Sequence, residues 1–166
     1  MYIPATLAML QQLVAVGSVQ PLSGTAFAVT PTLRESYAEG DDEELAEVAI
    51  GEAALASLRL LAAEPGESGL PLRRAVLVAD APDDDVTPRP DLDDAVVRIN
   101  GRVALNQVVA AYVDNAAAQD AVKAAIAVVD EADLGDEDAE LTVGDAQDHD
   151  LAWYATQELP FLLELL

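Results

Sequence analysis

The only histidine of the chain lies in the segment Asp148-His149-Asp150, directly before the apolar run Leu151–Ala155. An imidazole flanked by carboxylates gains basicity, and it can serve as a general base or as a pH sensor. The alternative is that Asp148 caps a turn at the polar start of a strand, while Trp153 and Tyr154 anchor the core. Both interpretations stay open, because residues adjacent in sequence do not generally point the same way. The candidate catalytic residues are therefore His149, Asp148 and Asp150, and the candidate binding residues are Trp153 and Tyr154.

Runs of carboxylates are the second feature that could do chemistry. Asp136, Asp138 and Glu140 alternate as they do at the start of a calcium-binding loop, but Leu141 occupies the position that requires glycine and Gln147 that of the bidentate glutamate. The aspartates of residues 83–94 could gather a weakly held Mg²⁺ or Ca²⁺. Runs of this kind are more often solvated loops, so the sequence predicts no metal site.

Other catalytic and cofactor motifs are missing from the sequence. The chain has no cysteine, which excludes disulfides, cysteine-ligated zinc, iron–sulfur clusters and thiol catalysis. It also lacks the glycine-rich phosphate-binding and dinucleotide-binding motifs, the zinc-protease motif and the nucleophile elbow of hydrolases. No cofactor is predicted.

Acidic residues dominate the charge of the chain. The 166 residues include 31 Asp and Glu but 8 Lys and Arg, a net charge of −23. So few basic side chains cannot bind nucleic acid by neutralising phosphates, and the same imbalance argues against an anionic membrane surface. The acids cluster in 39–52, 80–94 and 130–150, which hold 7, 7 and 10 of them. A basic protein is the partner that this charge favours, and the oligomeric state stays open.

The N-terminal region carries no charged side chain before Arg34. It lacks the basic start of a signal peptide, and its apolar run is broken by Gln11 and Gln12, well short of the ~20 apolar residues of a membrane span. We therefore expect a cytoplasmic protein whose N-terminus is buried in the fold.

Hydrophobic periodicity and capping residues predict interleaved helices and strands. Strands are expected at 1–3, where Pro4 stops the strand, and at 25–30, 74–79, 95–99, 108–114 and 151–155. Helices are expected at 7–16, 31–37, 42–63, 115–130 and 157–166, the first three capped by Thr6, Thr30 and Asp41. Residues 80–90 read as a mobile loop, and 133–150 fit either a loop or a helix.

This order of elements predicts an α+β fold. We expect a mixed β-sheet of about five to six strands with helices packed on it and a βαβ-type N-terminal half. Asn100-Gly101 indicates a hairpin between 95–99 and a weak second strand at 103–106. The whole chain, residues 1–166, is expected to form a single domain, with the Pro- and Gly-rich loop at 64–71 as its possible seam.

Four segments together resemble a known family: Tyr2–Thr6, Ala26–Pro31, Val86–Pro90, and Asp148–Tyr154 with Glu158-Leu159-Pro160. They are similar to an uncharacterised family of small actinobacterial proteins, and the Trp-Tyr ending is the most specific part. The resemblance implies an actinobacterial source and a cytosolic setting. It implies no mechanism.

Three functions remain open at this point. The first is a non-catalytic, acidic binding or regulatory protein of the cytosol. The second is a small enzyme whose site joins His149 to acids such as Asp148, Asp80 or Asp94, beside a pocket lined by Trp153 or Tyr154. The third is a salt-adapted domain of ordinary function, since a dense acidic surface with one lysine also suits high salt.

Overall fold

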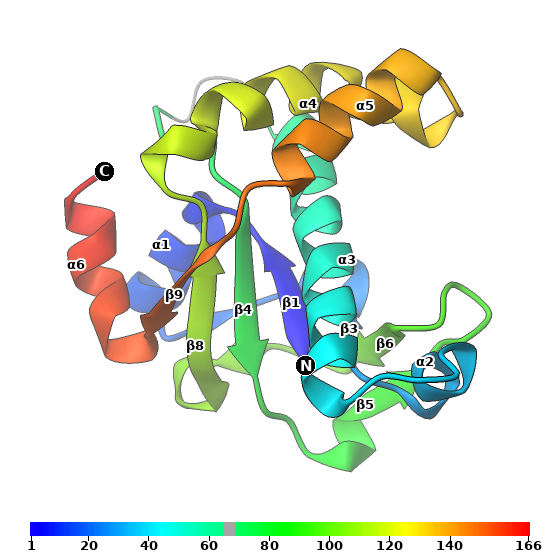
Figure 1. The fold of residues 1–166 in the computed structure, drawn as a ribbon. Helices are drawn as coiled ribbons and strands as arrows, with labels where there is room; N and C mark the ends of the chain where they lie inside the picture. The colour runs from blue at the N-terminus through cyan, green and yellow to red at the C-terminus, as the bar shows by residue number, and fades with distance from the viewer. Residues whose placement is uncertain (65–68) are drawn as a thin grey trace.

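A computed structural model describes residues 1–64 and 69–166 of the chain (Figure 1). Its main sheet has seven strands, and every neighbouring pair is antiparallel. From one edge to the other the strands are β5 (Val86–Pro88), β6 (Val96–Ile99), β3 (Thr25–Phe27), β1 (Tyr2–Ala5), β4 (Ala75–Ala79), β8 (Val108–Val113) and β9 (Ala152–Ala155). Two short strands, β2 (Ser18–Val19) and β7 (Val103–Ala104), pair with each other in a separate sheet.

Six α-helices surround this sheet: α1 (Leu7–Val16), α2 (Pro31–Ser36), α3 (Asp42–Ala63), α4 (Gln119–Asp133), α5 (Glu137–Gln147) and α6 (Leu159–Glu164). Short 3₁₀ turns occupy Leu22–Gly24, Asp83–Asp85, Leu105–Gln107, Ala116–Ala118 and Thr156–Glu158. Helices α1 and α6 bury their leucines against one face of the sheet, while α3 crosses the other face over β1, β3 and β4. The hairpin of α4 and α5 packs against the C-terminal part of α3, beyond the end of the sheet (Figure 1).

Helix ends follow the capping residues that the sequence predicts. The hydroxyl of Thr6 accepts the amide of Met9, and α1 ends at Gly17, which adopts the left-handed conformation with a φ of 89°. The carboxylate of Asp41 accepts the amide of Glu44 at 2.9 Å and so starts α3. The predicted caps Thr6 and Asp41 are therefore confirmed. They could be predicted because hydrogen bonds of this kind form between residues that are close in sequence.

The α+β class is confirmed, but the sheet differs from the one expected. It has seven strands instead of five to six, it is antiparallel instead of mixed, and its N-terminal half is not of the βαβ type. After α1 the chain passes through β2 and the 3₁₀ turn at Leu22–Gly24, where Ser23 and Gly24 both have positive φ. Strand β3 then pairs antiparallel with β1. Hydrophobic periodicity carries no information about strand direction.

The strand pairing also corrects two local predictions. Strand β6 does not form a hairpin with the segment after Asn100-Gly101, because it pairs with β3 and β5, while β7 pairs with β2. Pro4 lies inside β1 instead of stopping it, and it is buried. This position suits proline because β3 pairs with β1 only at Tyr2, so the β3 side of β1 needs no ladder hydrogen bond near Pro4.

Two acidic segments, residues 80–90 expected as a loop and residues 133–150 expected as either a loop or a helix, both contain regular structure. Residues 80–90 hold a 3₁₀ turn and the edge strand β5, and residues 133–150 hold α5, which Asp136 caps through the amide of Ala139. The expectation of one domain with a seam at 64–71 stays a prediction, since residues 65–68 lie outside the described part of the chain. Within the described ranges, no helix has both the length and the apolar character needed to cross a membrane.

Candidate functional site

A groove of about 570 Å³ opens between α3 and the connection from α5 to β9. One wall is a single face of α3, formed by Glu47, Ile50, Gly51 and Ala54 at helical spacing. The opposite wall is the segment 147–151, and the floor is made by Arg74 before β4 and Tyr112 on β8. Its volume lies within the range of sites for small ligands, roughly 300–1,000 Å³.

The floor rests on a buried ion pair. The guanidinium of Arg74 donates to both carboxylate oxygens of Asp114, through Nε at 2.9 Å and Nη2 at 2.7 Å. The backbone amide of Arg74 donates to the same carboxylate at 2.8 Å, and the amide of Asp114 returns a bond to the carbonyl of Arg74. Arg74 is 1% exposed and Asp114 is fully buried. A bidentate pair without water holds both side chains in one geometry.

The remaining bonds of Arg74 fix the wall of the groove opposite α3. Its Nη1 donates to Oε1 of Gln147 at 2.8 Å, and its Nη2 donates to the backbone carbonyl of His149 at 2.8 Å. The Nε2 of Gln147 then donates to the carbonyl of Gly51 on α3 at 3.0 Å. One network therefore connects β4, β8, the end of α5 and α3, so the groove is a preformed feature of the fold.

The three candidate catalytic residues are only partly brought together. His149 and Asp150 line the groove, whereas Asp148 is exposed at the end of α5, where its amide donates to the carbonyl of Gly144. The backbone of His149 bonds to Ala146 and to Arg74. Within the described ranges, no side chain forms a hydrogen bond with its imidazole.

The more distant acids considered for a site with His149 lie elsewhere. Asp80 directly follows β4, at the end opposite to Arg74, and it lies near the amino group of Met1. Asp94 accepts a hydrogen bond from Ser36 at 2.6 Å, beside α2. In the described part of the chain, no three His, Asp or Glu side chains come together as a metal site requires.

The two aromatic candidates lie on opposite faces of β9. Trp153 stands directly across from Tyr112 of β8, on the face that carries α3, and it is 57% exposed. Tyr154 stands across from Ala111 and packs into the core under α1 and α6. Only Trp153 therefore extends the surface of the groove, and Tyr154 has the anchoring position of the structural interpretation.

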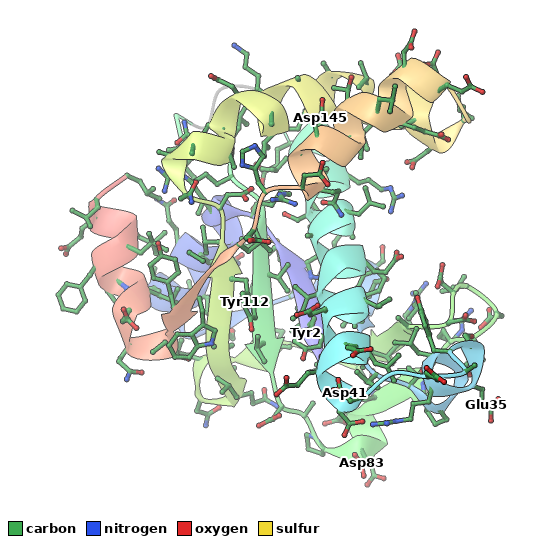
Figure 2. The ribbon with its side chains drawn as sticks, viewed as in Figure 1. Tyr2, Glu35, Asp41, Asp83, Tyr112 and Asp145 are labelled. Atoms are coloured by element: carbon green, nitrogen blue, oxygen red, sulfur yellow. The ribbon has the colours of Figure 1, made fainter. Side chains whose placement is uncertain are left out.

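The face of the sheet beside α3 is open over its last strands. Tyr112 and Tyr2, both half-buried, are labelled on this face in Figure 2. Burial raises the pKa of the Tyr2 hydroxyl above its ordinary value, and the neighbouring Tyr112 adds to the increase. Tyr2, Tyr112 and Trp153 thus share this face of the sheet, and Tyr112 also lines the groove.

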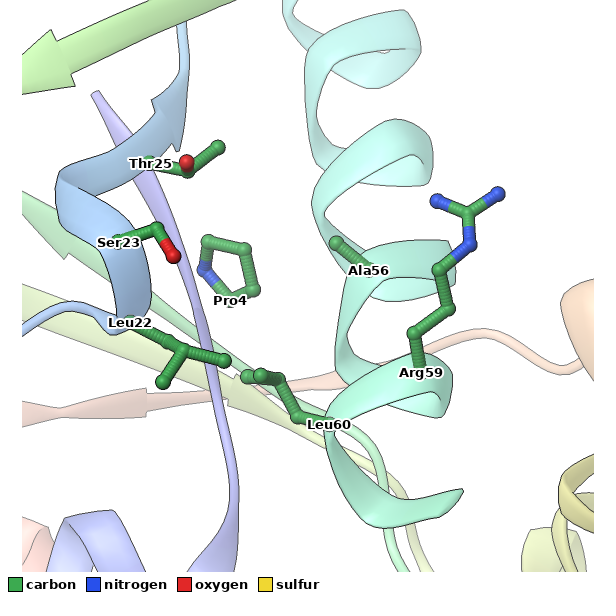
Figure 3. Close-up of a pocket in the computed structure, with 7 residues that line it drawn as sticks. All are labelled: Pro4, Leu22, Ser23, Thr25, Ala56, Arg59 and Leu60. Carbon is green, nitrogen blue, oxygen red and sulfur yellow. The ribbon is translucent and has the colours of Figure 1, made fainter. Parts of the chain in front are cut away.

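A second, smaller pocket of about 190 Å³ lies on the other side of α3 (Figure 3). Pro4 forms its centre, and Leu22 and Leu60 close it from two sides. The guanidinium of Arg59 at its rim is engaged with Asp133, through bonds of 3.0 and 2.9 Å. This pocket is apolar and small, and it offers few groups for specific recognition.

Most of the groove could not be recognised from the sequence. The segment 74–79 was predicted as a strand, but its pattern does not identify Asp114 as the partner of Arg74. Glu47, Gly51, Tyr112 and Gln147 carry no motif. They meet because α3 and three separate strands and connections converge, which only the tertiary structure specifies.

Comparison with known proteins gives one match. A model described as "Family of unknown function (DUF6912)" matches residues 1–163. Neither the curated proteins nor the solved structures contain a match to the chain. The match covers nearly every element described above, including the groove, and confirms the resemblance to an uncharacterised family.

Proposed function

The chain belongs to DUF6912, a family of unknown function, and from its own geometry we propose that it is a non-catalytic binding protein whose ligand site is the groove between α3 and residues 147–151. The observation that carries this proposal is the preformed groove itself. Its floor is held by the buried Arg74–Asp114 pair, and its wall by the bond from Gln147 to Gly51. Recognition sites gain affinity when their walls are fixed before the ligand arrives.

The side chains of the groove favour binding over catalysis. None of the described residues that line it is a serine, threonine, cysteine or lysine that could act as a nucleophile. Glu47, His149 and Asp150 could act there as general bases, but among the described residues no carboxylate bonds to the imidazole of His149 to orient it as in a catalytic histidine. A rigid, mixed polar and apolar hollow without a positioned nucleophile is typical of a binding site.

The composition supports the further parts of this proposal. A net charge of −23 favours a basic protein as the partner over nucleic acid or an anionic membrane. The uncharged N-terminal region, whose strand β1 lies within the sheet, and the lack of cysteine suit a cytoplasmic protein. The resemblance to small actinobacterial proteins supports a source of that kind.

A groove-filling substitution tests the proposal. Gly51 has no heavy atom within 4 Å of where a Cβ would stand, so Gly51→Met adds a side chain to the α3 wall without a clash. Gly144 of α5 has the same free space and lies outside the groove, so Gly144→Met is the matched control. Backbone amide shifts of the isotope-labelled chain are followed by NMR during titration with a cation, N-acetyl-arginine amide, an anion, citrate, and a neutral aromatic compound, indole.

The proposal expects at least one probe to shift the amides of residues 50–54 and 147–151. The shifts should disappear in Gly51→Met and persist in Gly144→Met. If no probe shifts these amides, or if both variants respond as the natural chain does, the groove is not the ligand site.

The enzyme hypothesis keeps one observation in its favour, because His149 and Asp150 both line the groove. It is tested with chromogenic carboxylic and phosphate esters, for which we expect no turnover above the buffer rate. Turnover that is lost in His149→Gln would overturn the non-catalytic assignment.

A further inference from the structure

The groove has an excess of negative charge that its own residues leave unpaired. Glu47 on α3 and Asp150 on the opposite connection both line it, and both are exposed. Arg74, the one arginine or lysine among the described lining residues, is neutralised by Asp114. The carboxylates of Glu47 and Asp150 form none of the hydrogen bonds or ion pairs described for this chain. The groove therefore attracts a positive group.

The floor is unsuited to an anion, although it contains an arginine. Nε and both terminal nitrogens of Arg74 already donate to Asp114, Gln147 and the carbonyl of His149. The side-chain amide of Gln147 is also occupied: its Oε1 accepts from Arg74, and its Nε2 donates to the carbonyl of Gly51. An incoming carboxylate or phosphate would find Arg74 1% exposed and already held by four hydrogen bonds, and it would also meet Glu47 and Asp150.

Aromatic rings continue from the groove to the edge of the sheet. Tyr112 lines the floor, and Trp153 stands across from it on β9, the outermost strand. Rings that are open on one face bind guanidinium and ammonium groups through cation–π contacts, and they also cover the apolar stems of arginine and lysine. The path from Glu47 over Tyr112 to Trp153 thus suits a long side chain with a positive end and an apolar neighbour.

These observations carry the proposed function one step further. We infer that the groove takes an arginine or lysine side chain of a basic protein segment, with its positive end between Glu47 and Asp150 and the adjoining residues of the segment over Tyr112 and Trp153. The inference rests on the proposed function, and it adds the chemical class of the ligand and the two carboxylates that recognise it.

The test compares two blocked peptides that differ in one charge. One is acetyl-Gly-Arg-Leu-Gly-amide, and the other carries citrulline, the neutral isostere, in place of arginine. Binding is measured by NMR titration of the isotope-labelled full chain. The inference expects the arginine peptide to shift the groove amides and that of Trp153, and the citrulline peptide to bind at least tenfold more weakly, about 1.4 kcal/mol.

Matched variants separate recognition in the groove from attraction by the whole acidic chain. The double change Glu47→Gln with Asp150→Asn should weaken the arginine peptide at least tenfold. The control, Glu43→Gln with Asp148→Asn, removes the same charge from exposed positions on α3 and at the end of α5 that do not line the groove. It should change the affinity less than twofold.

Each other outcome overturns the inference in a recognisable way. If the citrulline peptide binds as tightly as the arginine peptide, or if citrate is the probe that shifts the groove amides, the inference of a cationic ligand is wrong. The groove would then remain a binding site for another class of ligand. If both double variants weaken the binding of the arginine peptide equally, the peptide is attracted by the net charge of the whole chain. Glu47 and Asp150 then have no specific role in recognition. If no probe shifts the groove amides, the proposed function fails as well.

Discussion

Arg74 and Asp114 join the neighbouring strands β4 and β8 through a buried ion pair, with Nη2 and Oδ1 separated by 2.7 Å. The amide of Asp114 also donates to the carbonyl of Arg74, and the amide of Arg74 donates to the carboxylate of Asp114. The pair thus lies at the end of the hydrogen-bond ladder between β4 and β8, and it supports the floor of the groove. Its position makes it the part of the fold on which the site most depends.

Removal of one partner of this pair should be strongly destabilising. Asp114→Asn leaves the buried guanidinium of Arg74 without a counter-charge, and such a loss costs about 3–5 kcal/mol. Urea unfolding should show the midpoint shift with an unchanged slope. The double variant Arg74→Met with Asp114→Leu buries no charge, so it should recover most of the free energy of unfolding. A double variant as unstable as the single one would show that the bonds to Gln147 and His149 matter more than the ion pair.

Ser57 should contribute more to stability than an ordinary serine. It is fully buried on α3, where its hydroxyl donates to the carbonyl of Ala5 at 2.7 Å and accepts the amide of Ala75 at 3.0 Å. Ser57→Ala removes two buried hydrogen bonds, at a cost of about 1–3 kcal/mol in the free energy of unfolding. Thr142→Ala is the control, because its hydroxyl on α5 makes an exposed hydrogen bond to the carbonyl of Asp138, and it should stay within about 0.5 kcal/mol of the natural chain. Equal effects of the two substitutions would contradict this role.

Two glycine substitutions should act in opposite directions. Gly51→Ala places a methyl group in open space inside α3, and the better helix propensity of alanine should stabilise the chain by about 0.5–1 kcal/mol. Gly24→Ala meets the carbonyl oxygen of Ile99 at 2.7 Å and requires a φ of 66°, so it should be destabilising. Thermal unfolding of both variants tests the prediction, and a lower melting temperature for Gly51→Ala would contradict it.

Features that depend on neighbours in sequence were predictable, and features that depend on distant pairing were not. Thr6 and Asp41 set helix ends through local bonds, and the predicted bounds 7–16 and 42–63 agree with α1 and α3, whereas α4 and α6 begin later than predicted. Strand direction was different, because β3 pairs antiparallel with β1 and the hydrophobic pattern does not carry direction. The segment 103–106 has the composition of a hairpin strand, but β7 pairs with the distant β2.

The site follows the same division. His149, Asp150 and Trp153 were found because histidine and tryptophan are rare in this chain, and all three lie on the groove or beside it. The α3 wall was not predicted, since Glu47 and Gly51 resemble any other exposed helical residues until the strands beneath them are placed. The pairing of Arg74 with Asp114 in particular requires β4 and β8 to be known as neighbours, and the two residues are 40 positions apart in the sequence.

Two carboxylates near Arg59 should give opposite dependences of stability on pH. Burial raises the pKa of Glu52 above its ordinary value of 4.5, and the charge of Asp93 adds to the rise while Arg59 opposes it. The hydrogen bond from Arg59 lowers the pKa of Asp133 below its ordinary value of 3.8, against a smaller contribution from burial. A raised folded pKa favours folding most below the ordinary value and loses that benefit as pH rises through the folded pKa. A lowered folded pKa favours folding above the ordinary value and loses that benefit as pH falls through the folded pKa.

Neutral variants therefore separate the two groups. At neutral pH, Glu52→Gln should raise the free energy of unfolding, because it removes a charge that burial disfavours, and this gain should vanish as the pH falls below 4.5. Asp133→Asn should lower it by about 0.2–1 kcal/mol, the range for a half-exposed ion pair such as Arg59–Asp133, and the loss should shrink as the pH falls below 3.8. Urea unfolding of both variants and the natural chain, over a series from neutral to acidic pH, measures the differences. Effects of the same sign in the two variants at neutral pH would contradict this account and would indicate that the general repulsion of a −23 chain outweighs the local contacts.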